Sequence, residues 1–177
     1  MKKIVLAALA ALLSFNVLAV TSSDSGQGVE VKTFVLNNET ITLTHAAATT
    51  NAYGSITLGK LPEGLIAIHG AVLELGGVMA GFGTNTTTVS ASVGTVAATG
   101  ASLTGTVANV IASASAVGWT NRSAKVRGVT TDSATVDGTA TAPTLYLNVV
   151  CPVSLTNGTL SGNGKVRLIY SNAGDTN

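Results

Sequence analysis

Apolar and polar positions alternate most clearly near the C-terminus of the chain. Residues 145–151 are rich in strand-forming residues, and residues 159–170 alternate between an apolar and a polar face. The dipeptide Asn157-Gly158 between them is typical of a two-residue hairpin turn. We therefore expect a C-terminal hairpin that packs one face against the rest of the chain, because an isolated hairpin is only marginally stable. The apolar face comprises Leu160, Val166, Leu168 and Tyr170, and the polar face comprises Ser161, Asn163, Lys165 and Arg167.

A similar pattern opens the chain after residue 28. Val29, Val31, Thr33 and Val35 alternate with Glu30, Lys32, Phe34 and Leu36. Asn37-Asn38 then resembles a turn, and residues 40–44 form a second strand-like run. The spacing predicts an opening hairpin.

The most apolar segment outside the N-terminus is residues 65–75, which follow a Pro-Glu-Gly turn at residues 62–64. Both alternating faces are apolar, so the pattern predicts a central strand buried between two layers. A buried helix is the competing interpretation. Gly70 and the flanking glycines favour a strand.

The middle of the chain is less regular. Four glycines within residues 76–85 indicate a loop or a bulged strand, and residues 86–98 alternate as a strand with small side chains. Residues 103–111 have helical spacing with Thr104 as a potential N-cap, which predicts one short helical insert. Residues 112–132 are hard to assign, apart from a short strand over residues 125–129.

About eight short strands separated by turn residues predict an all-β fold. We expect an antiparallel β-sandwich, of jelly-roll or immunoglobulin-like topology, that forms one domain over residues 29–175. Self-comparison of the sequence gives no fixed-period repeat, which argues against a solenoid or a propeller.

The N-terminus has the features of a secretory signal. Lys2 and Lys3 precede an apolar run over residues 4–13, and small residues end at Ala19. We expect residues 1–19 to be a leader cleaved after Ala19, and residues 20–28 to be a flexible linker. The alternative is an N-terminal helix that packs on the domain and is retained. No later segment approaches the roughly 20 apolar residues that a membrane-spanning helix requires.

Charge excludes several partner classes. Loss of Lys2 and Lys3 leaves seven basic against eight acidic residues, a net charge of about −1. A nearly neutral surface does not attract nucleic acid, heparin-like ligands or anionic lipid. Only 10% of residues are charged, so solubility depends on Thr, Ser, Asn and Gly, whereas the 46% apolar content argues against disorder.

Candidate catalytic and metal-binding residues are few. His69 falls inside the apolar segment, where a core or strand-edge role is expected, and His45 ends a strand in a polar loop. The sequence contains neither Gly-x-Ser-x-Gly nor His-Glu-x-x-His. Asp132 and Asp137 do not follow the calcium-loop pattern, because Ala134 and Val136 occupy ligand positions. We therefore expect no enzymatic activity, no cofactor and no metal.

Cys151 is the only cysteine of the chain, so an intramolecular disulfide is impossible. It ends the apolar run at residues 145–151, directly before Pro152. We expect a small buried apolar residue at this position.

Four segments in order, residues 61–71, 137–142, 145–148 and 164–175, resemble a group of small proteins of tailed, mainly marine, bacteriophages. The shared pieces are a Pro-Glu-Gly turn before an apolar strand, an Asp-Gly-Thr-Ala-Thr-Ala segment before a Leu-Asn strand, and a final strand that ends in Gly-Asp. The resemblance covers most of residues 29–175. It implies a structural component of the virion (capsid, decoration or tail-associated) that functions in assembly.

Two functional hypotheses follow. The first is a virion protein, expected to be a homo-oligomer, that binds copies of itself or a capsid lattice. The second is an exported cell-surface or pilus-like subunit, periplasmic or extracellular after cleavage at Ala19. A carbohydrate-binding module is disfavoured because its aromatic candidates are only Trp119, Tyr53, Tyr146 and Tyr170.

Overall fold

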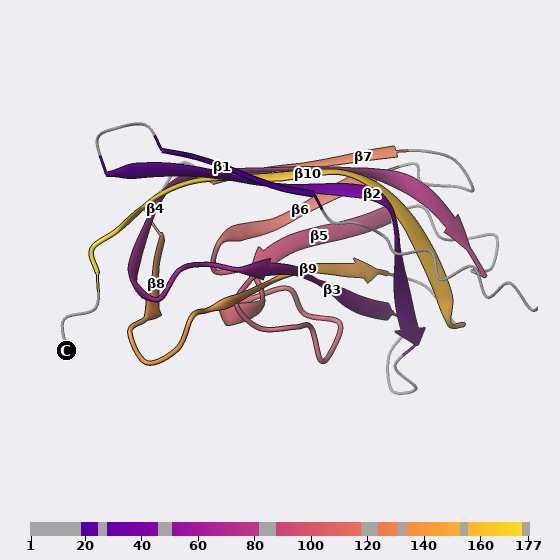
Figure 1. The fold of residues 1–177 in the computed structure, drawn as a ribbon. Helices are drawn as coiled ribbons and strands as arrows, with labels where there is room; N and C mark the ends of the chain where they lie inside the picture. Colours follow the sequence, from indigo (N-terminus) through magenta and orange to yellow (C-terminus); the bar gives the residue numbers. More distant parts are fainter. Residues whose placement is uncertain are drawn as a thin grey trace, which may run out of the picture.

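The computed structural model describes residues 19–24, 28–45, 51–81, 88–117, 124–130, 134–152 and 156–174. This part of the chain contains ten β-strands and one turn of 3-10 helix, η1 (Figure 1). Their bounds are β1 Ala19–Asp24, β2 Val29–His45, β3 Ala52–Lys60, β4 Gly64–Ala80, β5 Thr88–Gly94, η1 Gly105–Val107, β6 Ile111–Val117, β7 Ala124–Thr130, β8 Ala134–Gly138, β9 Thr144–Cys151 and β10 Gly158–Asn172.

The strands form one antiparallel sheet that curls until its two halves face each other (Figure 1). The order is β6-β5-β9-β3-β2-β10-β4-β7, with β1 added to β2 and β8 added to β4. Only two residue pairs, Thr44 with Tyr53 and His45 with Ala52, join β2 to β3 at the corner between the halves. The all-β antiparallel class is confirmed. A single curled sheet replaces the expected sandwich of two sheets.

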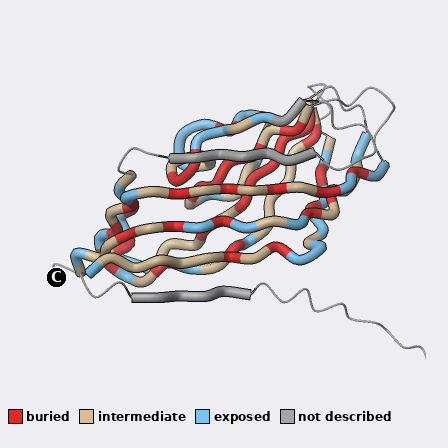
Figure 2. Tube along the Cα trace, turned by 90° about the horizontal axis from the view of Figure 1, so that it is seen from above, coloured by how far each residue is buried: buried red, intermediate tan, exposed pale blue. Residues whose placement is uncertain are grey.

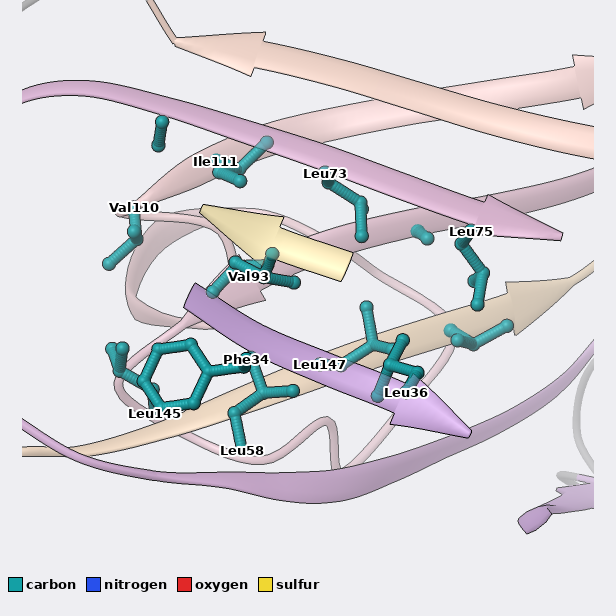
Figure 3. Close-up of a cluster of buried hydrophobic side chains, with 14 of the residues drawn as sticks. Phe34, Leu36, Leu58, Leu73, Leu75, Val93, Val110, Ile111, Leu145 and Leu147 are labelled. Atoms are coloured by element: carbon teal, nitrogen blue, oxygen red, sulfur yellow. The ribbon is translucent and has the colours of Figure 1, made fainter. Parts of the chain in front are cut away.

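One hydrophobic core lies between the halves. Along most of β2, β4 and β10 buried residues alternate with more exposed ones (Figure 2). The Phe34 ring from β2 lies beside Leu58 from β3 and Leu145 from β9 (Figure 3). Burial of each such side chain contributes about 1.5–3 kcal/mol, so the core is the main force that holds the halves together.

The predicted faces of β10 are confirmed, but the predicted C-terminal hairpin is wrong. Leu160, Val166, Leu168 and Tyr170 are buried. However, β10 pairs with β2 and β4, whereas β9 pairs with β3 and β5 in the other half. The Asn157 side chain does not close a hairpin turn; its Oδ1 accepts a hydrogen bond of 2.7 Å from the backbone N–H of His45.

The predicted opening hairpin is also wrong, because β2 is one continuous strand. Asn38 has a φ of 55°, and its N–H donates to Asn163 Oδ1 at 2.9 Å. The β2–β10 register shifts here, between Gly162 and Gly164. The bulge changes the phase of β2, so that Phe34 and Leu36 before it and Ile41 and Leu43 after it all face the core.

The strand predicted at residues 65–75 is β4, and the helix alternative is excluded. It is central in the sheet, because it pairs with β10 on one side and with β7 and β8 on the other. The prediction that both faces of this strand are buried is wrong. Ile66, Ile68 and Leu73 face the core, whereas Leu65 and Val78 on the other face are 38% and 52% exposed. An apolar run here reflects β-propensity on an outward face as well as burial.

The middle of the chain follows the predictions in part. The strand expected within residues 86–98 is β5, and the strand expected at residues 125–129 is β7. Of the helical insert predicted at residues 103–111, only the three residues of η1 are helical, and Ile111 is the first residue of β6. Thr104 precedes η1 without a side-chain capping bond, and Gly105 within it weakens a longer helix.

The expected flexible linker contains a strand. β1 pairs with β2 over its full length, from Ala19 opposite Val35 to Asp24 opposite Glu30. The unpaired edge of β2 provides backbone partners that override the polar composition of this segment. The predicted leader lies outside the described residues except for Ala19. Within the described residues, no helix has the length and apolarity needed to cross a bilayer.

Candidate functional site

The two histidines lie at opposite ends of β10. His69 is exposed, and its Nε2 lies 2.8 Å from Ser171 Oγ near the end of that strand. The expected core or backbone-bonded position of His69 is therefore wrong. His45 lies next to Asn157, before β10 begins. Its Nδ1 is buried and has no hydrogen-bond partner within the described part of the chain. The structure does not bring the histidines together.

The carboxylate of Asp137 closes a turn. Its Oδ1 accepts hydrogen bonds from Thr139 N at 3.0 Å and Thr139 Oγ1 at 2.8 Å. These bonds hold the pKa of Asp137 below its usual range. Asp132, the other carboxylate of the pair, lies outside the described residues. Among the residues that are described, no group of three His, Cys, Asp or Glu could hold a metal ion.

Cys151 is fully buried, as predicted, with its Sγ 3.8 Å from the Thr88 carbonyl oxygen. It fills a core position at the end of β9. Trp119, one of the aromatic candidates for a glycan platform, lies outside the described residues. Tyr170 is buried in the core and offers no platform.

A polar cluster joins the halves near the start of β2. The Tyr170 hydroxyl donates a 2.6 Å hydrogen bond to Glu30 Oε2. Burial, followed by the Glu30 carboxylate, raises the pKa of Tyr170 far above its usual range. Lys32 Nζ donates to the carbonyl of Lys60 on β3 at 2.5 Å and lies 5.6 Å from the centre of the Phe34 ring. Desolvation lowers the pKa of Lys32, partly opposed by Glu30. This cluster, called the clip below, connects β2 to β10 through the Tyr170–Glu30 bond and β2 to β3 through the Lys32–Lys60 bond.

Asn148 organises the outer face of the β3-β9-β5 half. Although β9 is otherwise apolar at its buried positions, Asn148 is fully buried. Its Oδ1 accepts from Ser55 Oγ at 2.6 Å and from Ala98 N at 2.8 Å. Its Nδ2 donates to the carbonyls of Val96 at 3.1 Å and Val107 at 2.8 Å. The side chain thereby holds residues 95–110 over this face, where they appear below β9 in Figure 1.

The outer face of the β2-β10-β4 half differs. Figure 1 shows no described segment over it, and adjacent residues form rows across three strands. One row contains Val31, Ile169 and Gly70. In another row Lys165 and Glu74 form an ion pair at 3.3 Å, with half of each side chain exposed. This face is rich in β-branched residues, and it also carries the exposed Arg167 on β10.

The edges of the sheet also differ from one another. β6 and β7, at the two ends of the strand order, contact each other. β8 is short, and its last residue Gly138 packs against Pro143. β1 pairs with β2 on one side only, and within the described chain no strand pairs with its other side. Sequence patterns missed this edge because the segment is polar.

Comparison with protein-family models, with curated proteins and with solved structures finds no match to this chain.

Proposed function

We propose that this chain is a non-enzymatic structural subunit that assembles with other protein subunits in a bacteriophage virion. The observation that carries the assembly role is the contrast between the two outer faces. Residues 95–110 cover one face, and the β2-β10-β4 face has no cover in the described part of the chain. The virion is the assembly implied by the sequence resemblance.

The uncovered face suits packing between identical subunits. Val31, Thr33 and Val35 on β2 and Ile169 on β10 are only partly exposed, so ordering them costs little side-chain entropy. Lys165 and Glu74 form an ion pair on this face. Arg167, two residues further along β10, is exposed on the same face, so a contacting subunit must also accommodate one positive charge.

The test is the composition of purified particles. Phage particles from the native host, separated on a density gradient, should contain the chain in a fixed ratio to the major capsid protein by quantitative mass spectrometry. Treatment with protease before disruption gives the control, because a contaminant outside the particle is removed. The virion assignment fails if the chain is abundant in cells and absent from gradient-purified particles.

A second candidate is an exported surface subunit, because cleavage at the predicted position after Ala19 would leave Val20–Asp24 able to pair with β2. In that case the mature chain begins at Val20, inside the first strand. Intact mass and N-terminal sequencing of the protein in periplasm, medium and particles separate the two functions. A Val20 start in the periplasm or medium supports export, and an intact leader in particles supports the virion.

A further inference from the structure

From the sheet edges we infer that β1 is a self-association edge: two copies of this chain join by antiparallel pairing of β1 with β1 of the second copy. One continuous sheet then crosses a two-fold axis. The inference rests on the proposed assembly role and names its partner as a second copy.

The first support is the backbone of β1. All six of its residues are paired with β2, from Ala19 with Val35 to Asp24 with Glu30. In an antiparallel strand the N–H and C=O of every second residue point away from the neighbour. The outer side of β1 therefore presents a row of backbone donors and acceptors to which no described strand is paired.

The second support is that the edges formed by β6, β7 and β8 are protected. β7 and β6 contact each other, which restricts access to both. β8 has five residues, includes Asp137 and packs its end against Pro143. Short strands, charges and neighbouring turns are the usual means by which a sheet edge avoids pairing with another molecule.

The third support is composition. β1 has the sequence AVTSSD, which contains neither lysine nor arginine nor proline. β7, in contrast, contains Lys125 and Arg127, and β8 contains Asp137. β1 thus lacks the residues that block edge pairing within its length, and its one charge, Asp24, stands at its end.

A second copy is the natural occupant because antiparallel pairing about a two-fold axis matches a strand with itself. If Ser22 lies on the axis, Val20 is opposite Asp24 of the second copy. The two Asp24 carboxylates, the only charges of β1, then lie at opposite ends of the ladder. This register avoids placing like charges directly opposite each other.

Cysteine cross-linking of the full chain tests the pairing. Thr21→Cys, Ser22→Cys and Ser23→Cys are made singly and oxidised across a concentration series, and dimers are measured by non-reducing gels and light scattering. Ser22→Cys should give a disulfide-linked dimer, because the two Cα atoms face each other within disulfide range. Ser102→Cys, exposed on the opposite half, is the matched control and should give no disulfide-linked dimer. The native Cys151 is fully buried and should not contribute.

A second variant distinguishes edge pairing from exchange of β1 between copies. Thr21 and Thr33 lie opposite each other in the β1–β2 ladder. In Thr21→Cys/Thr33→Cys the disulfide should form within one chain and fix β1 on its own β2. The locked chain should still dimerise in light scattering, since its outer edge remains available. A disulfide between chains, or a locked chain that no longer dimerises, would overturn edge pairing in favour of exchange.

A wild-type chain that is monomeric at every concentration, with none of the three β1 cysteines cross-linked, also overturns the inference. If that same chain is found in purified particles, the virion function stands while β1 pairing fails. If Ser22→Cys forms a cross-linked dimer but the chain is absent from particles, β1 pairing stands and the virion function fails.

Discussion

The two halves of the sheet differ in length and in cover. β2 and β4 have 17 residues each and β10 has 15, whereas β3, β9 and β5 have nine, eight and seven. The short half seals its outer face with residues 95–110, and one buried amide, that of Asn148, holds that cover. In the described part of the chain, the long half has no such cover over its outer face and no strand paired to the outer side of β1. The proposed function therefore places contact with other subunits on the long half.

The largest effect is expected from removing the cover of the short half. Asn148→Ala removes four hydrogen bonds of a fully buried amide, those with Ser55, Ala98, Val96 and Val107. Ala98 N–H keeps its bond to Ser55 Oγ, and the Val107 carbonyl keeps its bond from Ser92 Oγ. The free energy of unfolding should fall by about 3 kcal/mol, measured by urea denaturation. Ser90→Ala removes only an exposed hydrogen bond to Ser115 and is the control. Equal stability of the two variants would show that the amide does not hold the cover.

The next largest effect concerns the corner that joins the halves. A Cβ on Gly54 would lie 2.0 Å from the carbonyl oxygen of Thr42, so β3 approaches β2 at a distance that only glycine allows. Gly54→Ala should cost about 2–3 kcal/mol in urea denaturation because the corner must open. At Gly100 no described atom lies within 4 Å of an added Cβ, so Gly100→Ala should change stability by less than about 0.5 kcal/mol. A Gly54→Ala protein as stable as Gly100→Ala would contradict the close approach.

A smaller, pH-dependent effect is expected at the clip between β2 and β10. The folded protein raises the pKa of Tyr170, so this group stabilises the fold fully below the unfolded pKa of about 10. The contribution is lost as pH rises from there through the folded pKa.

Tyr170→Phe should cost about 1–2 kcal/mol near neutral pH, because the bond to Glu30 is lost. It should also reduce the loss of stability above about pH 10, measured by urea denaturation at several pH values. Tyr146→Phe, on β9, serves as control and should keep the alkaline loss of the wild type. An unchanged alkaline profile in Tyr170→Phe would assign that loss to other groups.

The smallest effect on stability, and the sharpest on assembly, is expected on the uncovered face. Val31→Lys places a charge beside Ile169 and should alter the free energy of unfolding by less than about 0.5 kcal/mol. It should nevertheless reduce incorporation into particles, because a lysine must be desolvated at the contact. Thr106→Lys, exposed on the covered half, should incorporate normally. Equal incorporation of the two variants would exclude the uncovered face as a contact.

Local pattern in the sequence predicts the strands better than their partners. The faces of β10 follow from alternation alone, since each position depends only on its neighbours two residues away. The choice of β2 and β4 as its partners depends on residues between 79 and 142 positions away in the chain. Asn157-Gly158 and Asn37-Asn38 are typical turn sequences, yet neither closes a hairpin. Asn157 Oδ1 accepts from the backbone of β2, and the Asn38 N–H donates to a side chain of β10. Turn propensity does not specify which partner is available.

The candidate surfaces were predictable only in part. Asn148 within an apolar run is a visible sequence signal, because a polar residue in a buried strand requires partners. The identity of those partners, Ala98, Val96 and Val107, depends on where residues 95–110 fold. The β1 edge gave no signal, since AVTSSD forms a strand here only through the backbone of β2.

The position of β10 has a consequence for biosynthesis. The last strand of the chain lies in the interior of the long half, between β2 and β4. On the ribosome β2 and β4 therefore cannot be joined until residues 158–172 have been synthesised. Only a chain that extends through β10 adds Leu160, Val166 and Leu168 to the core. A nascent chain that stops before β10 would expose two long strand edges to proteases and chaperones.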